Sequence, residues 1–117
     1  QKILNKKIEI FSTCIRVPVF VGHGESIYLE TEKNIDLKKL TSKIKKMEGL
    51  TLVNEPVDGG YITPDESAGE DNVFISRMRL GRVKNSLGLW VVADNLRKGA
   101  ALNSVQIAEL LIKKEAK

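Results

Sequence analysis

Residues 14–25 have the sequence C-I-R-V-P-V-F-V-G-H-G-E, and the rest of the chain is interpreted around them. Three β-branched residues alternate along this stretch, as in a strand that turns one face to a core: Val17, Val19 and Val21. Arg16 and the chain's single histidine, His23, would lie roughly 20 Å apart on a straight strand. Pro18 and the glycines on either side of His23 permit a bend. The stretch therefore predicts a strand that bends between an arginine and a histidine.

Residue type alone makes these two side chains weak indicators of a site. An arginine at the start of a strand is usually a solvated surface charge, and a histidine beside glycines is more often a turn residue than a catalyst. Cys14 lies in an apolar stretch, where cysteine usually acts as a small buried hydrophobic residue. We therefore place Cys14 in the core.

Length and composition exclude several classes of function. A chain of 117 residues is long enough for one domain with one core. Aromatic residues make up only 5%, which argues against a stacking surface for single-stranded nucleic acid. No stretch approaches the roughly 20 apolar residues of a membrane span, and no secretory signal is present. One cysteine cannot form an internal disulfide. We expect a cytoplasmic protein that binds neither nucleic acid nor a membrane.

The pattern of apolar residues predicts an α+β fold, a mixed or antiparallel sheet with a helix packed on one face and a further C-terminal helix. One helix begins at an Asp36 N-cap and stops at Gly49, and the other runs from an Asp94 N-cap to about residue 114. A loop rich in proline, glycine and acids is expected to be exposed at residues 63–72. The predicted strands cover residues 8–14 leading into the Arg16 segment, 26–32, 50–54, 73–79 and 87–93, the last in the centre of the sheet.

Two of these elements carry basic side chains. In the strand over residues 73–79, strict alternation would put Ile75 and Arg77 on one face and Ser76 and Met78 on the other. In the first helix the apolar face is predicted to consist of Leu37, Leu40, Ile44 and Met47. Five lysines surround its outer side: Lys38, Lys39, Lys43, Lys45 and Lys46. A phosphate or nucleic-acid patch is one interpretation, but we favour an ordinary solvated helix face.

Three blocks of sequence resemble the aspartate-semialdehyde dehydrogenase family. They are S-T-C-I-R-V-P-V-F-V-G-H-G-E at residues 12–25, Y-I-T-P-D-E-S-A-G-E-D-N-V-F-I-S-R-M-R at residues 61–79 and L-W-V-V-A-D-N-L-R-K-G-A-A-L-N-S-V-Q at residues 89–106. The family's nucleotide-binding domain and catalytic cysteine would lie upstream of Gln1. The resemblance implies a C-terminal domain like that of glyceraldehyde-phosphate dehydrogenase. Residues 1–93 would be a substrate-binding and dimerisation domain, incomplete at its N-terminus. Residues 94–117 would be a helix that packs on the missing nucleotide-binding domain.

The resemblance also implies an activity and three site residues. In the family, NADPH reduces β-aspartyl phosphate to aspartate semialdehyde through a cysteine thioester, a step in lysine, threonine and methionine synthesis. Arg16 matches the arginine that holds the substrate's carboxylate, which suits a planar guanidinium. His23 matches the acid/base histidine, and an imidazole can exchange protons near neutral pH. Asn95 matches an amide that touches the nicotinamide end of the cofactor, although the pair Asp94-Asn95 is also typical of helix capping.

The family commonly has a serine after the histidine, whereas this chain has Gly24. Cys14 does not match the nucleophile, and no metal site is assigned. We therefore expect a homodimer associating through its sheet, a parent enzyme that uses NADP, and a fragment that is inactive alone. Two alternatives remain, an N-acetyl-glutamyl-phosphate reductase type of enzyme and a non-enzymatic α+β interaction module.

Overall fold

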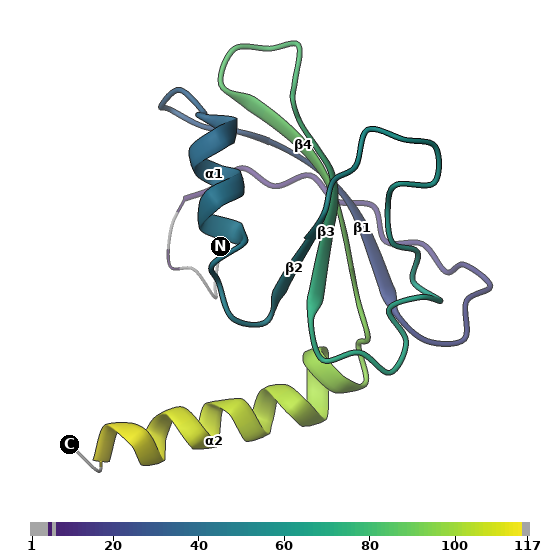
Figure 1. Ribbon diagram of the computed structural model, residues 1–117, viewed down its shortest axis with the longest axis vertical. Coiled ribbons are helices and arrows are strands. Elements are labelled where there is room, and N and C mark those ends of the chain that lie inside the picture. The colour runs from purple at the N-terminus through teal and green to yellow at the C-terminus, as the bar shows by residue number, and fades with distance from the viewer. Residues whose placement is uncertain (1–4, 6, 116–117) are drawn as a thin grey trace.

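A four-stranded mixed sheet forms the centre of the molecule in the computed structural model, which describes residue 5 and residues 7–115 (Figure 1). The strand order is β1-β4-β3-β2, so β4 lies inside the sheet and is antiparallel to both neighbours, while β2 is parallel to β3. This confirms the α+β prediction and the central place of the apolar run at residues 87–93. The strands are β1 (His23–Glu30), β2 (Leu50–Val53), β3 (Val73–Leu80) and β4 (Ser86–Ala93).

Helix α1 (Leu37–Ile44) connects β1 to β2 and covers one face of the sheet (Figure 1). Asp36 caps its N-terminus as predicted, because the carboxylate accepts a hydrogen bond from the Lys39 backbone N–H at 3.0 Å. The helix ends at Ile44, earlier than predicted, so Met47 lies beyond it and is 56% exposed. The buried core between helix and sheet consists of Ile44, Ile75, Met78 and Leu87, with Leu37 and Leu40 packed against it.

A β-bulge in β3 overturns the predicted alternation. The register with β4 shifts after Ser76, and Arg77 has a positive φ of 53°. The Asn54 side chain bonds both backbone groups next to the bulge, accepting from the Met78 N–H at 2.6 Å and donating to its C=O at 3.2 Å. The extra residue turns Met78 to the α1 side together with Ile75. The prediction that Met78 faces away from Ile75 was therefore wrong.

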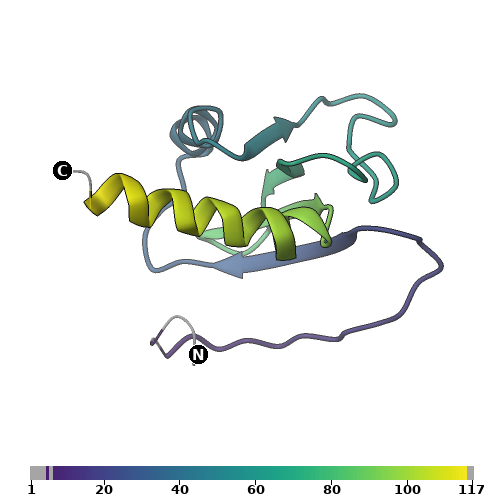
Figure 2. The same cartoon turned by 90° about the horizontal axis from the view of Figure 1, so that it is seen from below.

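Residues 7–22 form an extended segment outside the sheet, which we call the arm. Figure 2 shows it running beside β1 and apart from the sheet. The strand predicted over residues 8–14 is therefore absent, and Cys14 is exposed instead of buried. Phe11 and Phe20 are 98% and 100% exposed. Alternating apolar residues favour a strand, but a strand also needs a ladder partner, and residues 9–22 join no strand of the described sheet.

The predicted bend in the arm is confirmed. The Val19 N–H donates to the Val17 C=O at 2.9 Å, which closes a tight turn around Pro18. Gly22 then takes a φ of +105°, a conformation that favours glycine. The chain therefore changes direction twice before it enters β1.

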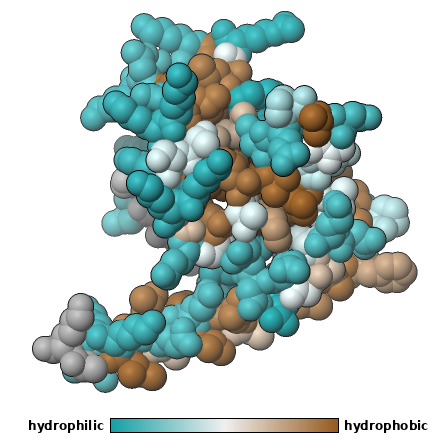
Figure 3. Space-filling view, in the orientation of Figure 1, coloured by the Kyte–Doolittle hydropathy of each residue, from teal (hydrophilic) through white to brown (hydrophobic). Residues whose placement is uncertain are grey.

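The C-terminal helical region projects from one end of the sheet (Figure 1). A short π-helix, η1 (Arg97–Ala101), continues directly as α2 (Leu102–Glu115), close to the predicted range. No described residue of α2 is buried, and hydrophobic side chains show along it on the surface (Figure 3). Among the described residues, no helix is both long and apolar enough to cross a membrane. The exposed apolar residues of α2 are Val105, Ile107, Leu110, Leu111 and Ile112.

Candidate functional site

His23 is the first residue of β1, and its Cα pairs with that of Ala93 at the end of β4. The imidazole is exposed. Asn95 follows β4 by two residues, and its side-chain oxygen accepts a hydrogen bond from the Gly22 N–H at 2.9 Å. The structure therefore brings together the histidine and the amide, two of the three predicted site residues, at neighbouring strand ends.

Arg16 does not join this group. It lies on the exposed arm, seven residues before His23. Within the described part of the chain, no hydrogen bond or ion pair links Arg16 to His23 or Asn95. A shared ligand would therefore require Arg16 to approach through the bend at Pro18.

Asp94 is the buried polar residue that organises this end of the sheet. One carboxylate oxygen accepts from the backbone N–H groups of Leu96 and Arg97 at 2.8 and 3.1 Å. Asp94 was predicted as the N-cap, but the N-cap residue of η1 is Leu96, so Asp94 instead bonds the turn that leads into the helix. The other oxygen accepts from the Gly69 N–H at 2.8 Å. The Gly69 bond, followed by those from Arg97 and Leu96, lowers the pKa of Asp94, although burial opposes the shift. A single charged group thus joins β4, η1 and the loop before β3.

That loop, residues 61–71, packs on the sheet face opposite α1. The Trp90 indole N–H donates to the Ile62 C=O at 2.8 Å, and the Ile62 N–H donates to the Ser76 hydroxyl at 3.3 Å. The Arg77 guanidinium lies 4.4 Å from the centre of the Tyr61 ring. The loop predicted over residues 63–72 is exposed at residues 65, 66 and 68–71, as expected, but Ser67 is buried, and the preceding residues Tyr61 and Ile62 contact the sheet. The tryptophan in the central strand was the sequence signal for this contact. An indole N–H that is removed from solvent needs an acceptor, and here another segment supplies it.

The loop is also braced internally. The backbone N–H and the hydroxyl of Thr63 both donate to the Glu66 carboxylate, at 2.8 and 2.7 Å, and these bonds lower the pKa of Glu66. Ser67 is fully buried, and its hydroxyl donates to the Pro64 C=O at 2.8 Å. This turn presents Pro64 to the start of β1, where it lies against Gly22.

Gly24 has a structural reason to lack a side chain. A Cβ added there would lie 2.5 Å from Cη2 and 2.8 Å from Cζ2 of Trp90. The indole is held by its hydrogen bond to Ile62, so a serine at this position would force the ring to move. This chain therefore has glycine, and not the family's common serine, at a position where the Trp90 ring leaves no room for a side chain.

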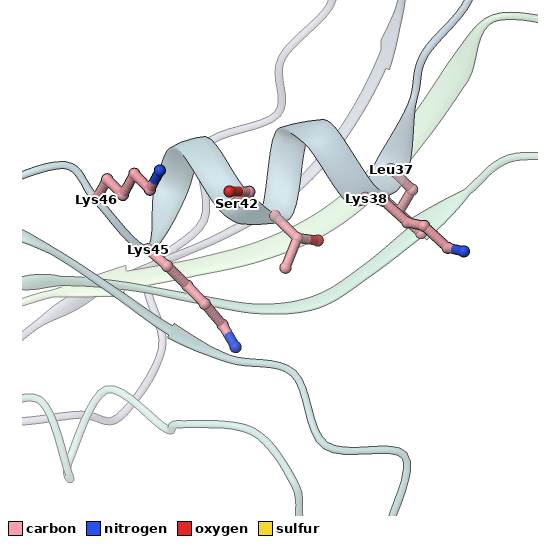
Figure 4. Close-up of a pocket in the computed structure, with 6 residues that line it drawn as sticks. Leu37, Lys38, Ser42, Lys45 and Lys46 are labelled. Carbon is pink, nitrogen blue, oxygen red and sulfur yellow. The ribbon is translucent and has the colours of Figure 1, made fainter.

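The lysines of α1 and of the turn after it do not form a phosphate site. Lys38, Lys45 and Lys46 border a shallow depression of about 570 Å³ that Leu37, Thr41 and Ser42 also line. Figure 4 shows Lys38, Lys45 and Lys46 pointing in different directions, so their ammonium groups do not converge on one point. A solvated helix face remains the better interpretation. Among residue 5 and residues 7–115, no three His, Cys, Asp or Glu side chains gather as metal ligands would.

The family model for the semialdehyde dehydrogenase dimerisation domain matches residues 1–98. The chain belongs to this family. Among curated members, the aspartate-semialdehyde dehydrogenases of Rickettsia bellii and Aquifex aeolicus are each 46% identical to it. Each alignment covers 97% of this chain and 34% of the relative. The chain thus spans about a third of the length of the relatives it matches.

Solved structures of semialdehyde dehydrogenases have the same fold. Aspartate semialdehyde dehydrogenase II from Vibrio cholerae, complexed with ASA, superposes with a TM-score of 0.79 at 41% identity. The match covers 86% of this chain and 30% of that structure. The enzyme from Francisella tularensis also gives a TM-score of 0.79, at 22% identity, which supports the fold alone.

The lowered pKa of Asp94 predicts how acid acts on this dimerisation domain. A carboxyl with a lower pKa in the folded state stabilises the fold above its ordinary value of about 4, and this stabilisation is lost as the pH falls through the folded pKa. Asp94→Asn removes the titrating group, so the free energy of unfolding should fall less steeply with acid in the variant. Urea unfolding from about pH 6 to pH 2.5 measures this, with exposed Asp65→Asn as the control. Parallel curves for wild type and Asp94→Asn would contradict the assignment.

Proposed function

We propose that this chain forms the C-terminal part of an NADP-dependent aspartate-semialdehyde dehydrogenase, which interconverts β-aspartyl phosphate and aspartate semialdehyde in the synthesis of lysine, threonine and methionine. The observation that carries the proposal is the hydrogen bond between Gly22 and Asn95, which places Asn95 beside the segment that bears His23. These residues are far apart in sequence and match two functional positions of the family. The named relatives favour this activity over that of an N-acetyl-glutamyl-phosphate reductase.

In this proposal each residue does what its chemistry permits. The exposed His23 imidazole takes and returns the proton of a cysteine supplied by the rest of the enzyme. Arg16 binds the substrate's α-carboxylate with both arms of its guanidinium. Asn95 uses its oxygen on Gly22, which leaves its Nδ2 hydrogens to donate to the carboxamide of a nicotinamide. The nicotinamide cofactor, when bound, supplies or accepts the hydride.

The activity is tested with the complete enzyme that contains this chain. It should oxidise aspartate semialdehyde in the presence of phosphate and NADP, followed by the absorbance of NADPH. The 117-residue chain alone should show no turnover, because its one cysteine, Cys14, does not match the family's nucleophile for the thioester. Cys14→Ser in the complete enzyme is the control, and it should leave turnover unchanged because Cys14 lies on the exposed arm. Turnover by the chain alone, or loss of activity in Cys14→Ser, would overturn the proposal.

Substitutions at Arg16 and His23 separate binding from proton transfer. Arg16→Lys keeps the charge and loses the bidentate geometry, so KM for aspartate semialdehyde should rise by about tenfold or more while kcat changes little. His23→Ala should lower kcat by roughly a hundredfold or more with a smaller effect on KM. Exposed Arg82→Lys is the matched control for the first variant. Normal kinetics for His23→Ala with an intact fold would remove its catalytic assignment.

We also propose that the chain pairs with a second copy through the arm. Helix α1 covers one face of the sheet, and the loop at residues 61–71 packs on the other. Little of either sheet face therefore remains free for the association through the sheet that the sequence predicts. The arm instead exposes its apolar side chains, among them Ile10, Phe11 and Ile15. The description of the family as a dimerisation domain supports a homodimer.

Sedimentation equilibrium measures this association. The double variant Ile10→Ser and Phe11→Ser should raise the dimer dissociation constant by at least about tenfold, because it removes apolar contact area. Val57→Ser, at an exposed apolar residue outside the arm, should leave it unchanged. A wild-type monomer at high micromolar concentration would exclude the dimer. A dimer insensitive to the arm substitutions would exclude the arm as its contact.

A further inference from the structure

The two polar atoms of the Asn95 side-chain amide have different roles. A backbone N–H can only donate, so the atom that faces it at 2.9 Å is the side-chain carbonyl oxygen. The Nδ2 group takes no part in this bond. Asn95 therefore has one end that acts within the chain and another that can act on a ligand.

Gly22 is a position where the backbone needs such a restraint. Glycine has more conformational freedom than any other residue, and Gly22 uses it, with a φ of +105°. Pro64 lies close on one side, since a Cβ at Gly22 would be 3.0 Å from the Pro64 oxygen and 3.1 Å from its Cβ. The side-chain oxygen of Asn95 also restrains Gly22, through its hydrogen bond to the Gly22 N–H. Together they fix the direction in which the chain enters β1 at the next residue, His23.

Asn95 can act as a restraint because its own position is fixed. The preceding residue, Asp94, is only 4% exposed and accepts three backbone hydrogen bonds, from Gly69, Leu96 and Arg97. Arg97 in turn forms an ion pair with Asp71 in the loop at residues 61–71. A movement of Gly22 that keeps its bond to Asn95 would therefore have to displace a turn that is bonded to β4, η1 and the loop at residues 61–71.

We propose that Asn95 is a positioning residue for His23, and that it acts through its carbonyl oxygen on Gly22. This role is separate from a contact of its Nδ2 hydrogens with a nicotinamide cofactor. The catalytic consequence rests on the proposed dehydrogenase function, whereas the positioning itself does not. Displacement of a reacting group by about 1 Å can lower a rate by about a hundredfold, so a restraint one residue away from the imidazole affects turnover.

Two substitutions separate the two ends of the amide. Asn95→Asp keeps an oxygen for the Gly22 N–H and loses the Nδ2 donors. Asn95→Ala loses both. Asn34→Ala, in the exposed loop before α1, is the control.

The first measurement is made on the chain itself. NMR hydrogen exchange of the Gly22 amide should be at least about tenfold faster in Asn95→Ala and close to wild type in Asn95→Asp and Asn34→Ala. The chain has one histidine, so the imidazole signals belong to His23 without further assignment. These signals should change in Asn95→Ala through altered surroundings. Unchanged exchange of Gly22 in Asn95→Ala, or equally fast exchange in Asn95→Asp, would overturn the proposal.

The second measurement is made on the complete enzyme. In Asn95→Ala, kcat should fall by about tenfold or more and KM for the cofactor should rise, because both ends are lost. In Asn95→Asp, KM for the cofactor should rise while kcat stays within a few-fold of wild type. Equal losses of kcat in the two variants would show that only the Nδ2 donors matter and would overturn the catalytic part. A wild-type enzyme inactive on aspartate semialdehyde would instead reject the proposed function, while the exchange result would still decide the positioning.

Discussion

The hydrogen bonds made by two adjacent side chains after β4 hold the candidate site together. Asp94 joins the start of η1 to Gly69 of the loop, and Asn95 joins the same turn to Gly22 at the start of β1. The β1–β4 ladder and the bonds of the loop to Trp90 and Ser76 bring these segments together, and the two side chains link them at this end of the sheet. The ionised form of Asp94 is the one that these bonds favour, so the arrangement is strongest at neutral pH. The position of His23 thus depends on a carboxylate that it does not touch.

The sequence predicted the elements whose signals are local. The Asp36 cap and the interior strand β4 are each encoded within a few consecutive residues, and the structure confirms them. The bulge at Arg77 could not be predicted in this way, because it is held by Asn54, 24 residues away from Met78. The same limit applies to residues 61 and 62, which precede the predicted loop; the acidic residues of the loop itself are exposed as predicted. The contact of Ile62 with the sheet depends on hydrogen bonds to Trp90 and Ser76.

The arm shows a different limit of pattern reasoning. Its alternating valines predict a strand, yet a strand becomes stable only when its backbone groups pair with another strand. Residues 9–22 of the arm belong to no strand of the described sheet, and apolar side chains such as Phe11 and Phe20 are exposed. The three predicted site residues divide accordingly. His23 and Asn95 lie at paired strand ends and are brought together, whereas Arg16 lies on the arm and is not.

Gly24 connects the packing of the sheet to the position of the histidine. The family's common serine would offer a hydroxyl next to the imidazole, but here Trp90 occupies the space of its Cβ. The indole cannot move away without losing its hydrogen bond to Ile62, which fixes the loop against the sheet. The restraint proposed for His23 does not use residue 24; it acts through Gly22 and the side-chain oxygen of Asn95. A side chain at residue 24 would meet the Trp90 ring, which is bonded to the loop, so the packing of the loop and the absence of a side chain next to His23 are linked.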